Sequence, residues 1–118
     1  MSAPRRGDIY LVEFDPARGH EIQKTRPALV IQNDIGNRYS PVTIVAAITS
    51  KLSPIPYPVD VVVSPSPSNG LSVPSAIKLG QIRSVDRTRL AKRLGKLGNS
   101  DMRQVDNAIK LSLGLIAI

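Results

Sequence analysis

The sequence predicts a mainly β fold, a small barrel or sandwich closed by one C-terminal amphipathic helix. Three observations lead to this expectation. Short runs rich in β-branched residues recur between residues 8 and 85, glycine and proline separate them, and helical spacing of apolar side chains appears only from residue 99 on. The 118 residues are enough for one domain and hardly two, so we expect a single domain over residues 1–118.

Five strands follow from these runs. Residues 8–14 are rich in β-branched and aromatic side chains, which favours a first strand. Residues 28–32 and 42–49 are almost wholly apolar and are expected to be buried on both faces. Residues 59–63 and 77–85 complete the set, with a bulge expected at Gly80. Residues 33–37 have turn chemistry, and the basic stretch 87–96 is a candidate sixth strand.

The C-terminal segment has the pattern of a helix. Asn99 or Ser100 is expected to cap it, and Asp101 suits its first turn. Apolar residues then recur at helical spacing at Met102, Val105, Ile109, Leu113 and Ile116. We expect this helix to cover the core rather than to bind a ligand.

The charge balance favours an anionic partner. Lys plus Arg is 16 and Asp plus Glu is 9, so the formal net charge is 16 − 9 = +7, with nucleic acid as the leading partner and a simple solubility charge as the alternative. The absence of cysteine excludes a disulfide framework and a thiolate metal site. Residues 1–7 have no apolar core and residues 111–118 are too short to cross a bilayer, so we expect no signal peptide, no membrane contact and a cytoplasmic location.

The segment 24–34 is the most informative part of the chain, because it places a short cationic stretch before a run that predicts a buried strand. Pro27 biases Arg26 towards an extended backbone, which would present a fixed guanidinium to a phosphate. Thr49, at the end of another buried strand, could donate a hydrogen bond to the same group. The structural alternatives are a solvated surface arginine and a threonine that is simply a good β former.

Metal catalysis has little support, since there is one histidine, His20, and no pair of carboxylates at ligand spacing. No glycine-rich phosphate loop is present either, so we expect no metal and no cofactor. Cleavage of RNA suits the remaining side chains, because RNA carries its own nucleophile, the 2′-hydroxyl. The residues alone thus support a basic, β-rich nucleic-acid binder or a nuclease.

An ordered set of motifs resembles the MazF/PemK family of toxin endoribonucleases. The motifs lie at residues 6–10 (Arg-Gly-Asp-Ile-Tyr), 15–16, 19–34, 45–50, 79 and 81–86, and they cover nearly the whole chain. The resemblance implies an SH3-like β-barrel with helices, of the CcdB/Kid superfold, working as a homodimer. It also implies metal-independent, sequence-specific cleavage of single-stranded mRNA, which leaves a 2′,3′-cyclic phosphate and a 5′-hydroxyl and inhibits translation. The implied partner is an antitoxin with a disordered, acidic segment.

The resemblance also assigns residues. The family's catalytic arginine falls on Arg26 and its catalytic threonine on Thr49, with Glu21 and His20 as candidates for catalytic support. The expected RNA-binding residues are Arg18, Gln23, Lys24, Thr25, Ser50, Lys51, Gln81 and Arg83. Many relatives have other residues at His20, Ile22 and Gly80, and these departures bear on the RNA sequence preference.

Two alternatives remain at this stage. Gyrase-directed toxins share the fold and cleave no RNA, but they lack the arginine–proline and strand-end threonine pair that this chain has. A non-catalytic RNA-binding barrel is the second alternative. It is disfavoured because the chain has only four aromatic side chains, Tyr10, Phe14, Tyr39 and Tyr57, on which bases could stack.

Overall fold

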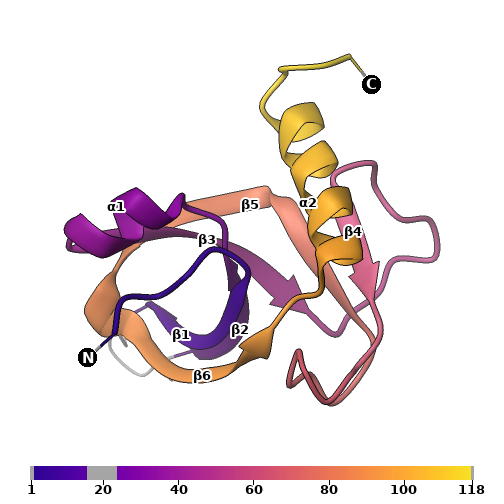
Figure 1. The fold of residues 1–118 in the computed structure, drawn as a ribbon. Helices are drawn as coiled ribbons and strands as arrows, with labels where there is room; N and C mark the ends of the chain where they lie inside the picture. Colours follow the sequence, from indigo (N-terminus) through magenta and orange to yellow (C-terminus); the bar gives the residue numbers. More distant parts are fainter. Residues whose placement is uncertain (1, 16–23, 118) are drawn as a thin grey trace.

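A computed structural model describes residues 2–15 and 24–117, which fold into one six-stranded antiparallel sheet with helices at its sides. Figure 1 shows the strands curling around the core, with the short helix α1 at one end and α2 beside β4. The sheet order is β4-β5-β3-β2-β1-β6. The elements are β1 (Asp8–Asp15), β2 (Lys24–Val30), α1 (Asp34–Tyr39), β3 (Val42–Thr49), β4 (Asp60–Val63), β5 (Ser75–Asp86), the 3₁₀ turn η1 (Arg87–Arg89), β6 (Leu90–Lys96) and α2 (Asn99–Ser112).

The long strand β5 pairs with two neighbours, β3 and β4, and its pairing with β3 is interrupted by a bulge. Ile82 lies opposite Ala46, whereas Lys78 already lies opposite Ala47, so the residues between them, including Gly80, have no partner on β3. A bulge of this kind increases the local twist and re-aims the strand. The bulge expected at Gly80 is therefore confirmed, and so is a strand, β6, in the basic stretch 87–96.

The two edge strands of the sheet are β4 and β6. Among the described strands they form no pair, so strand pairing does not close the sheet into a barrel. The loop of residues 64–74, between β4 and β5, instead returns to β6, where the Lys96 N–H donates to the Ser68 carbonyl at 2.8 Å. The connection between β4 and β5 thus links that side of the sheet to the edge strand β6.

Apolar side chains cover both faces of the central strands. The larger cluster contains Ile9, Leu29, Ile77, Leu79 and Val105, and α2 covers it through Val105 and Ala108. The smaller cluster contains Val12, Phe14, Ala28, Val30, Val45 and Val85. Burial on both faces of β2 and β3 is therefore confirmed, as is the covering role of α2; each fully buried large aliphatic side chain contributes roughly 1.5–3 kcal/mol.

Two local expectations, for the second strand and for residues 33–37, were wrong. The second strand runs from Lys24 to Val30, not over residues 28–32, because pairing with β1 extends it towards its N-terminus. Residues 33–37 open the helix α1 rather than a simple turn, since the Asn33 side chain caps it by accepting the Gly36 N–H at 2.7 Å.

The ends of α2 also differ from expectation. Its N-cap is Gly98, without a side-chain cap, because α2 starts one residue before Ser100. Its last expected apolar positions, Leu113 and Ile116, lie beyond the helix and are 61% and 41% exposed. Helical spacing alone did not show where the helix ends. Within the described residues, no helix combines the length and the apolarity needed to cross a membrane.

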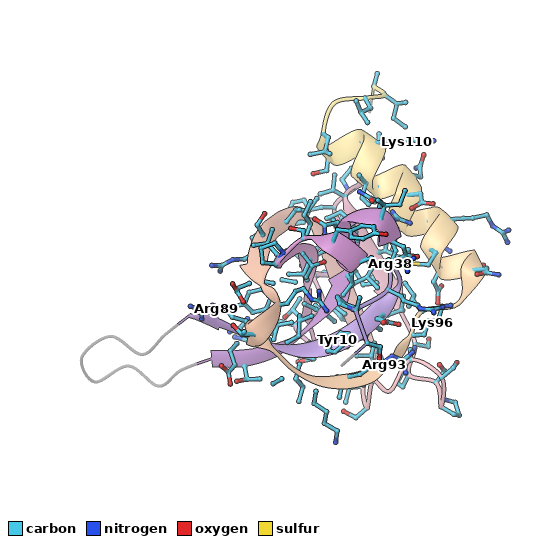
Figure 2. All side chains as sticks on the ribbon, turned by 60° about the vertical axis from the view of Figure 1, so that its left-hand side comes forward. Tyr10, Arg38, Arg89, Arg93, Lys96 and Lys110 are labelled. Atoms are coloured by element: carbon cyan, nitrogen blue, oxygen red, sulfur yellow. The ribbon has the colours of Figure 1, made fainter. Side chains whose placement is uncertain are left out.

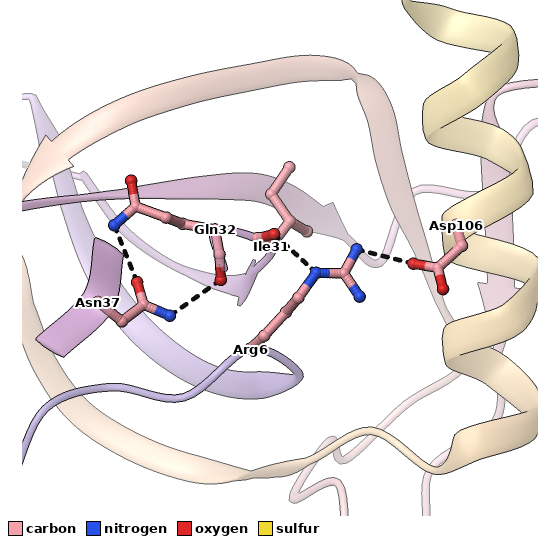
Figure 3. A network of polar contacts seen from close by, with 5 residues as sticks. All are labelled: Arg6, Ile31, Gln32, Asn37 and Asp106. Atoms are coloured by element: carbon pink, nitrogen blue, oxygen red, sulfur yellow. Dashed lines mark hydrogen bonds and ion pairs between the residues drawn. The ribbon is translucent and has the colours of Figure 1, made fainter. Parts of the chain in front are cut away.

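A polar network fixes the end of the sheet next to α1 (Figure 3). The Arg6 guanidinium donates to the Ile31 carbonyl at 2.8 Å and to Asp106 of α2 at 2.7 Å. Asn37, fully buried, donates to the Gln32 carbonyl at 2.9 Å and accepts the Thr43 hydroxyl at 2.7 Å. Asp34 joins this network by accepting the Arg6 N–H and the Asn37 amide. The buried Asn37 side chain is well satisfied by these hydrogen bonds. We call the following set the polar clamp: Arg6, Ile31, Gln32, Asp34, Asn37, Thr43 and Asp106.

Candidate active site

The register of β2 and β3 explains how two distant sequence positions come together. Ala28 lies opposite Ala47, Leu29 opposite Ala46 and Val30 opposite Val45. Continuing this register would place Arg26 opposite Thr49, on the same face of the two strands. The described pairing stops at Ala28, and the next residue, Pro27, has no N–H to donate. The two strand ends therefore enclose an opening instead of a further pair.

A pocket of about 520 Å³ occupies this opening. Arg26 and Pro27 of β2 line one side, and Ile48 and Thr49 of β3 line another. The remaining lining residues are Leu11, Ser50, Lys51, Gly70, Leu71, Ser72, Val73, Ser75 and Leu94. The pocket therefore has polar and cationic groups from the strand ends and aliphatic groups from the surrounding elements.

Arg26 lies within β2, opposite Val12 of β1, rather than in the loop before the strand. From the sequence, Arg26 was expected just before the start of the strand. This was wrong, because β2 begins at Lys24, two residues before Arg26. Its side chain is exposed, and among the described residues its guanidinium has no hydrogen-bond or ion-pair partner. A planar cation with its donors free, on a backbone fixed by strand pairing, suits the binding of a phosphate.

The Thr49 hydroxyl accepts one hydrogen bond, and it donates none to any side chain or backbone group in residues 2–15 and 24–117. The acceptor oxygen receives the Lys51 N–H at 3.1 Å, which holds the side chain of this half-buried residue in place. A hydroxyl has one donor and two acceptor sites, so its hydrogen remains able to donate to a ligand. The turn at Thr49–Lys51 thus restrains the Thr49 oxygen at the pocket and leaves its hydrogen available for donation.

The structure brings some of the other expected RNA-binding residues into this pocket and leaves others outside it. Ser50 and Lys51 line it and are exposed. Thr25 is exposed, but its side chain lies on the opposite face of β2 from Arg26, because successive side chains of a strand point to opposite faces. Lys24 begins β2, and its side chain lies outside the described part, as do Arg18, His20, Glu21 and Gln23 entirely.

Gln81 and Arg83 of β5 do not line the pocket. Gln81 is exposed within the bulge, and the Arg83 guanidinium lies over the Phe14 ring with 5.3 Å to its centroid. A cation over an aromatic face is a favourable contact in itself. Any RNA contact of these two residues would therefore lie along the neighbouring sheet face and not in the pocket.

Sequence reasoning missed one wall of the pocket entirely. The loop 64–74 was given no chemical role, yet Gly70, Leu71, Ser72 and Val73 line the cavity next to Arg26 and Thr49. Spacing could not reveal this, because the loop reaches the pocket only after β4 has crossed to the sheet edge. Its wealth of serine, proline and glycine was the one signal, and that signal is typical of any connection.

Positive charge is spread over several elements besides the pocket. Figure 2 shows Arg89, Arg93 and Lys96 along the turn before β6 and β6 itself, with Arg38 on α1 and Lys110 on α2. Two of these cations have structural partners, since Arg93 pairs with Asp8 at 3.2 Å and Arg89 donates to the Glu13 carbonyl at 3.2 Å. Across residues 2–15 and 24–117, no three His, Cys, Asp or Glu side chains gather as a metal site would require.

These features define a small, basic, antiparallel β protein with an arginine and a threonine at the mouth of a pocket. Residues 5–113 match the family described as PemK-like, MazF-like toxin of type II toxin-antitoxin system. The chain belongs to this family, as its motifs predicted.

Individual relatives agree with the family assignment. The Endoribonuclease MazF of Staphylococcus saprophyticus is 45% identical over 114 residues, which cover 97% of this chain and 94% of that protein. The crystal structure of MazE-MazF from Deinococcus radiodurans (Form-II) superposes with a TM-score of 0.82 at 26% identity, covering 98% of this chain and all of the other. A mycobacterial endoribonuclease in complex with its cognate antitoxin has the same fold, with a TM-score of 0.78 at 23% identity, 98% of this chain and 100% of that one being covered.

Proposed function

We propose that this chain is the toxin of a type II toxin–antitoxin pair and acts as an endoribonuclease on single-stranded mRNA. One observation carries the proposal: the Arg26 guanidinium, which has no partner in the described part of the chain, and the Thr49 hydroxyl line the same pocket. The 45% identical relative, which bears the name Endoribonuclease MazF, supports it. The SH3-like barrel is the finer fold proposal, supported by the curl of the sheet and by the loop that bridges its edges.

The proposed reaction uses the substrate's own nucleophile. The 2′-hydroxyl loses its proton and its oxygen bonds to the adjacent phosphorus, and the bond to the leaving 5′-oxygen breaks as that oxygen gains a proton. The products are a 2′,3′-cyclic phosphate and a 5′-hydroxyl. No metal ion is needed, because negative charge on the phosphorane is stabilised by protein donors.

Each pocket residue has a role in this proposal. Arg26 binds the scissile phosphate with two parallel N–H donors, and Thr49 donates its hydroxyl hydrogen to the same group. Lys51 and Ser50 position neighbouring phosphates. The proton transfers are assigned to no single residue; Glu21 and His20 are the candidates, with Arg26 restricted to charge stabilisation by its high pKa. Removing one preorganised donor of this kind typically lowers kcat about 10²–10³-fold.

The remaining contacts are proposed at a coarser level. Arg18, Gln23, Lys24, Thr25, Gln81 and Arg83 are proposed to contact RNA outside the pocket. Two copies form a homodimer, and an antitoxin with a disordered acidic segment covers the site, which suits the net charge of +7. The mycobacterial endoribonuclease in complex with its cognate antitoxin and the Deinococcus radiodurans MazE-MazF structure support an antitoxin partner. A cytoplasmic location follows from an mRNA substrate.

Incubation of the purified chain with a long mixed-sequence RNA in EDTA tests the proposal. We expect cuts at a restricted set of sites, with cyclic phosphate on the upstream fragment and a free 5′-hydroxyl on the downstream one. Intact RNA would contradict the proposal. Inhibition of gyrase in the same preparation would then favour a gyrase-directed toxin, whereas salt-sensitive binding without cleavage would favour a non-catalytic RNA-binding protein.

A further inference from the structure

We infer that the pocket beside Arg26 and Thr49 receives one unstacked nucleobase adjoining the scissile phosphate, and that Val73 and Ser72 select this base. The inference deepens the proposed ribonuclease function and rests on it. Four kinds of observation carry it: the chemistry of the lining, the rigidity of the loop 64–74, its close packing on β6, and the exposure of its two pocket-facing residues.

The lining of the pocket has two parts that match the two parts of a nucleotide. Arg26 and Lys51 supply positive charge, and Thr49 supplies a hydroxyl donor, which together suit a phosphate. The rest of the lining is largely aliphatic, from Leu11, Pro27, Ile48, Leu71, Val73 and Leu94. A volume of about 520 Å³ lies in the range of pockets that hold small organic ligands, roughly 300–1,000 Å³. A base packed on the aliphatic part would leave its phosphate at the cationic part.

The loop that forms the far wall is held by the side chain of Asn69, which is only 3% exposed. Its amide oxygen accepts the N–H groups of Ser66 and Leu71, both at 3.0 Å, and its amide nitrogen donates to the Ser64 carbonyl at 2.9 Å. Three hydrogen bonds from one buried side chain fix the loop backbone at both ends of the turn. The wall is therefore preorganised and does not need a ligand to order it.

Two glycines let the loop and β6 approach more closely than any other residues would allow. A Cβ atom at Gly70, where φ is +71°, would lie 2.1 Å from the Leu94 carbonyl oxygen, and one at Gly95 would lie 2.3 Å from the Ser68 carbonyl oxygen. Only glycine fits such contacts. The loop is thus packed tightly on β6 at both glycines, Gly70 in the loop and Gly95 in β6. This packing holds the residues that follow Gly70 against the pocket.

The two residues that follow Leu71 face the cavity with groups that a ligand can use. Val73 lines the pocket and is 46% exposed, so the size of its side chain sets part of the free space, whereas Leu71 is 8% exposed and belongs to the core. The Ser75 hydroxyl is committed to the Val73 carbonyl at 2.9 Å. Within the described part of the chain, the exposed Ser72 hydroxyl makes no hydrogen bond, so it can bind the polar edge of a base. We therefore assign size selection to Val73 and edge recognition to Ser72.

The test uses substitutions of opposite sign at Val73. Val73→Phe fills the pocket and Val73→Ala enlarges it, so the first should disfavour purines at one position next to the cut and the second should favour them. Val62 of β4 is a matched control, because it is a valine of 45% exposure that does not line the pocket. The probe is a set of oligoribonucleotides that differ only in the bases flanking one cleavage site, and the readout is the relative kcat/KM for each base.

We expect V73F to shift the purine-to-pyrimidine ratio at one flanking position by about tenfold or more, V73A to shift it the other way, and V62F and V62A to leave it unchanged. Ser72→Ala should flatten the preference at the same position. Unchanged ratios in folded, active Val73 variants would overturn the inference, and so would loss of all cleavage by both folded variants. Unchanged ratios with weakened antitoxin binding would assign the pocket to the antitoxin instead. If the wild-type chain itself cuts no oligonucleotide, the proposed function fails, and that result is distinct from all of these.

Discussion

The two ends of strand β2 use arginine in opposite ways. Beyond its C-terminal end, Arg6 of the polar clamp has its side-chain donors on the Ile31 carbonyl and on Asp106, which ties the N-terminal segment to β2 and α2. Near its N-terminal end, Arg26 is exposed at a pocket, with no partner among the described residues. One guanidinium is committed to structure, and the other remains available to a ligand.

This difference shows what a binding site requires of the fold around it. Donors that are satisfied within the protein stabilise it and have nothing to offer a substrate, whereas free donors contribute little to stability and can bind an incoming charge. At the clamp end, the Arg6 and Asn37 side chains have hydrogen-bond partners within the protein. At the pocket end, the described β2–β3 pairing stops at Ala28 and a pocket follows. Substitutions at the two ends should therefore separate stability from activity.

The largest expected effect is loss of activity in Arg26→Ala. We expect kcat to fall about 10²–10³-fold, because the main donor to the phosphorane is removed, while the free energy of unfolding changes by less than about 0.5 kcal/mol. Arg26→Lys should fail nearly as badly, since a point charge cannot replace two parallel donors. Single-turnover cleavage and urea unfolding of the same preparations measure both quantities. Near-normal cleavage by Arg26→Ala would remove the assignment.

The opposite result is expected for Arg6→Ala. Loss of the hydrogen bonds to Ile31 and Asp106, both partly exposed, should lower the free energy of unfolding by about 1–2 kcal/mol and leave the cleavage rate of the folded fraction unchanged. Arg103→Ala on α2 is the control, because Arg103 is an exposed arginine outside the clamp and should be nearly neutral. Equal free energies of unfolding for Arg6→Ala and Arg103→Ala would show that the Arg6 contacts do not stabilise the fold.

The smallest effect concerns Asp34 and pH. The Arg6 backbone N–H, 2.6 Å from its carboxylate, lowers the pKa of Asp34, with the Asn37 amide assisting. Because the folded-state pKa lies below the unfolded one, the carboxylate stabilises the fold above the ordinary aspartate pKa, and this contribution is lost as pH falls through the lower folded value. Asp34→Asn should therefore be less stable than wild type near neutral pH, with a gap that narrows below about pH 4. Urea unfolding at several pH values measures the difference in free energy of unfolding between the two proteins. A difference that does not change with pH would contradict this prediction.

Much of the fold could be predicted from the sequence because its strands are strongly patterned. The near-continuous apolar runs at 28–32 and 42–49 identified strands buried on both faces, and the family motifs located Arg26 and Thr49. The start of β2 was placed too late because Lys24 and Thr25 are not apolar, and their strand conformation comes from pairing with β1. Tertiary contacts, not local preference, set that boundary.

The pocket shows where such prediction stops. Arg26 and Thr49 were expected to lie at one site, but no role in that site was expected for Ser72 and Val73. These two residues reach the pocket because the loop packs on the edge strand β6 at Gly70 and Gly95. A contact of that kind depends on two glycines 25 positions apart, and neither has a pattern that indicates it. The predictions of a turn at 33–37 and of a side-chain cap for α2 were wrong because the same residue types favour turns and helix caps.

The most direct test of the central claim, that the exposed guanidinium of Arg26 stabilises the attack of RNA on itself, uses one short substrate in two forms. An oligonucleotide with ribose at the cleavage site is compared in EDTA with the same oligonucleotide carrying a single 2′-deoxyribose there. We expect both to bind the wild-type chain with similar affinity and only the first to be cut, giving a cyclic phosphate. Cleavage of the deoxyribose form at a comparable rate would show that the nucleophile is not the 2′-hydroxyl and would contradict the account.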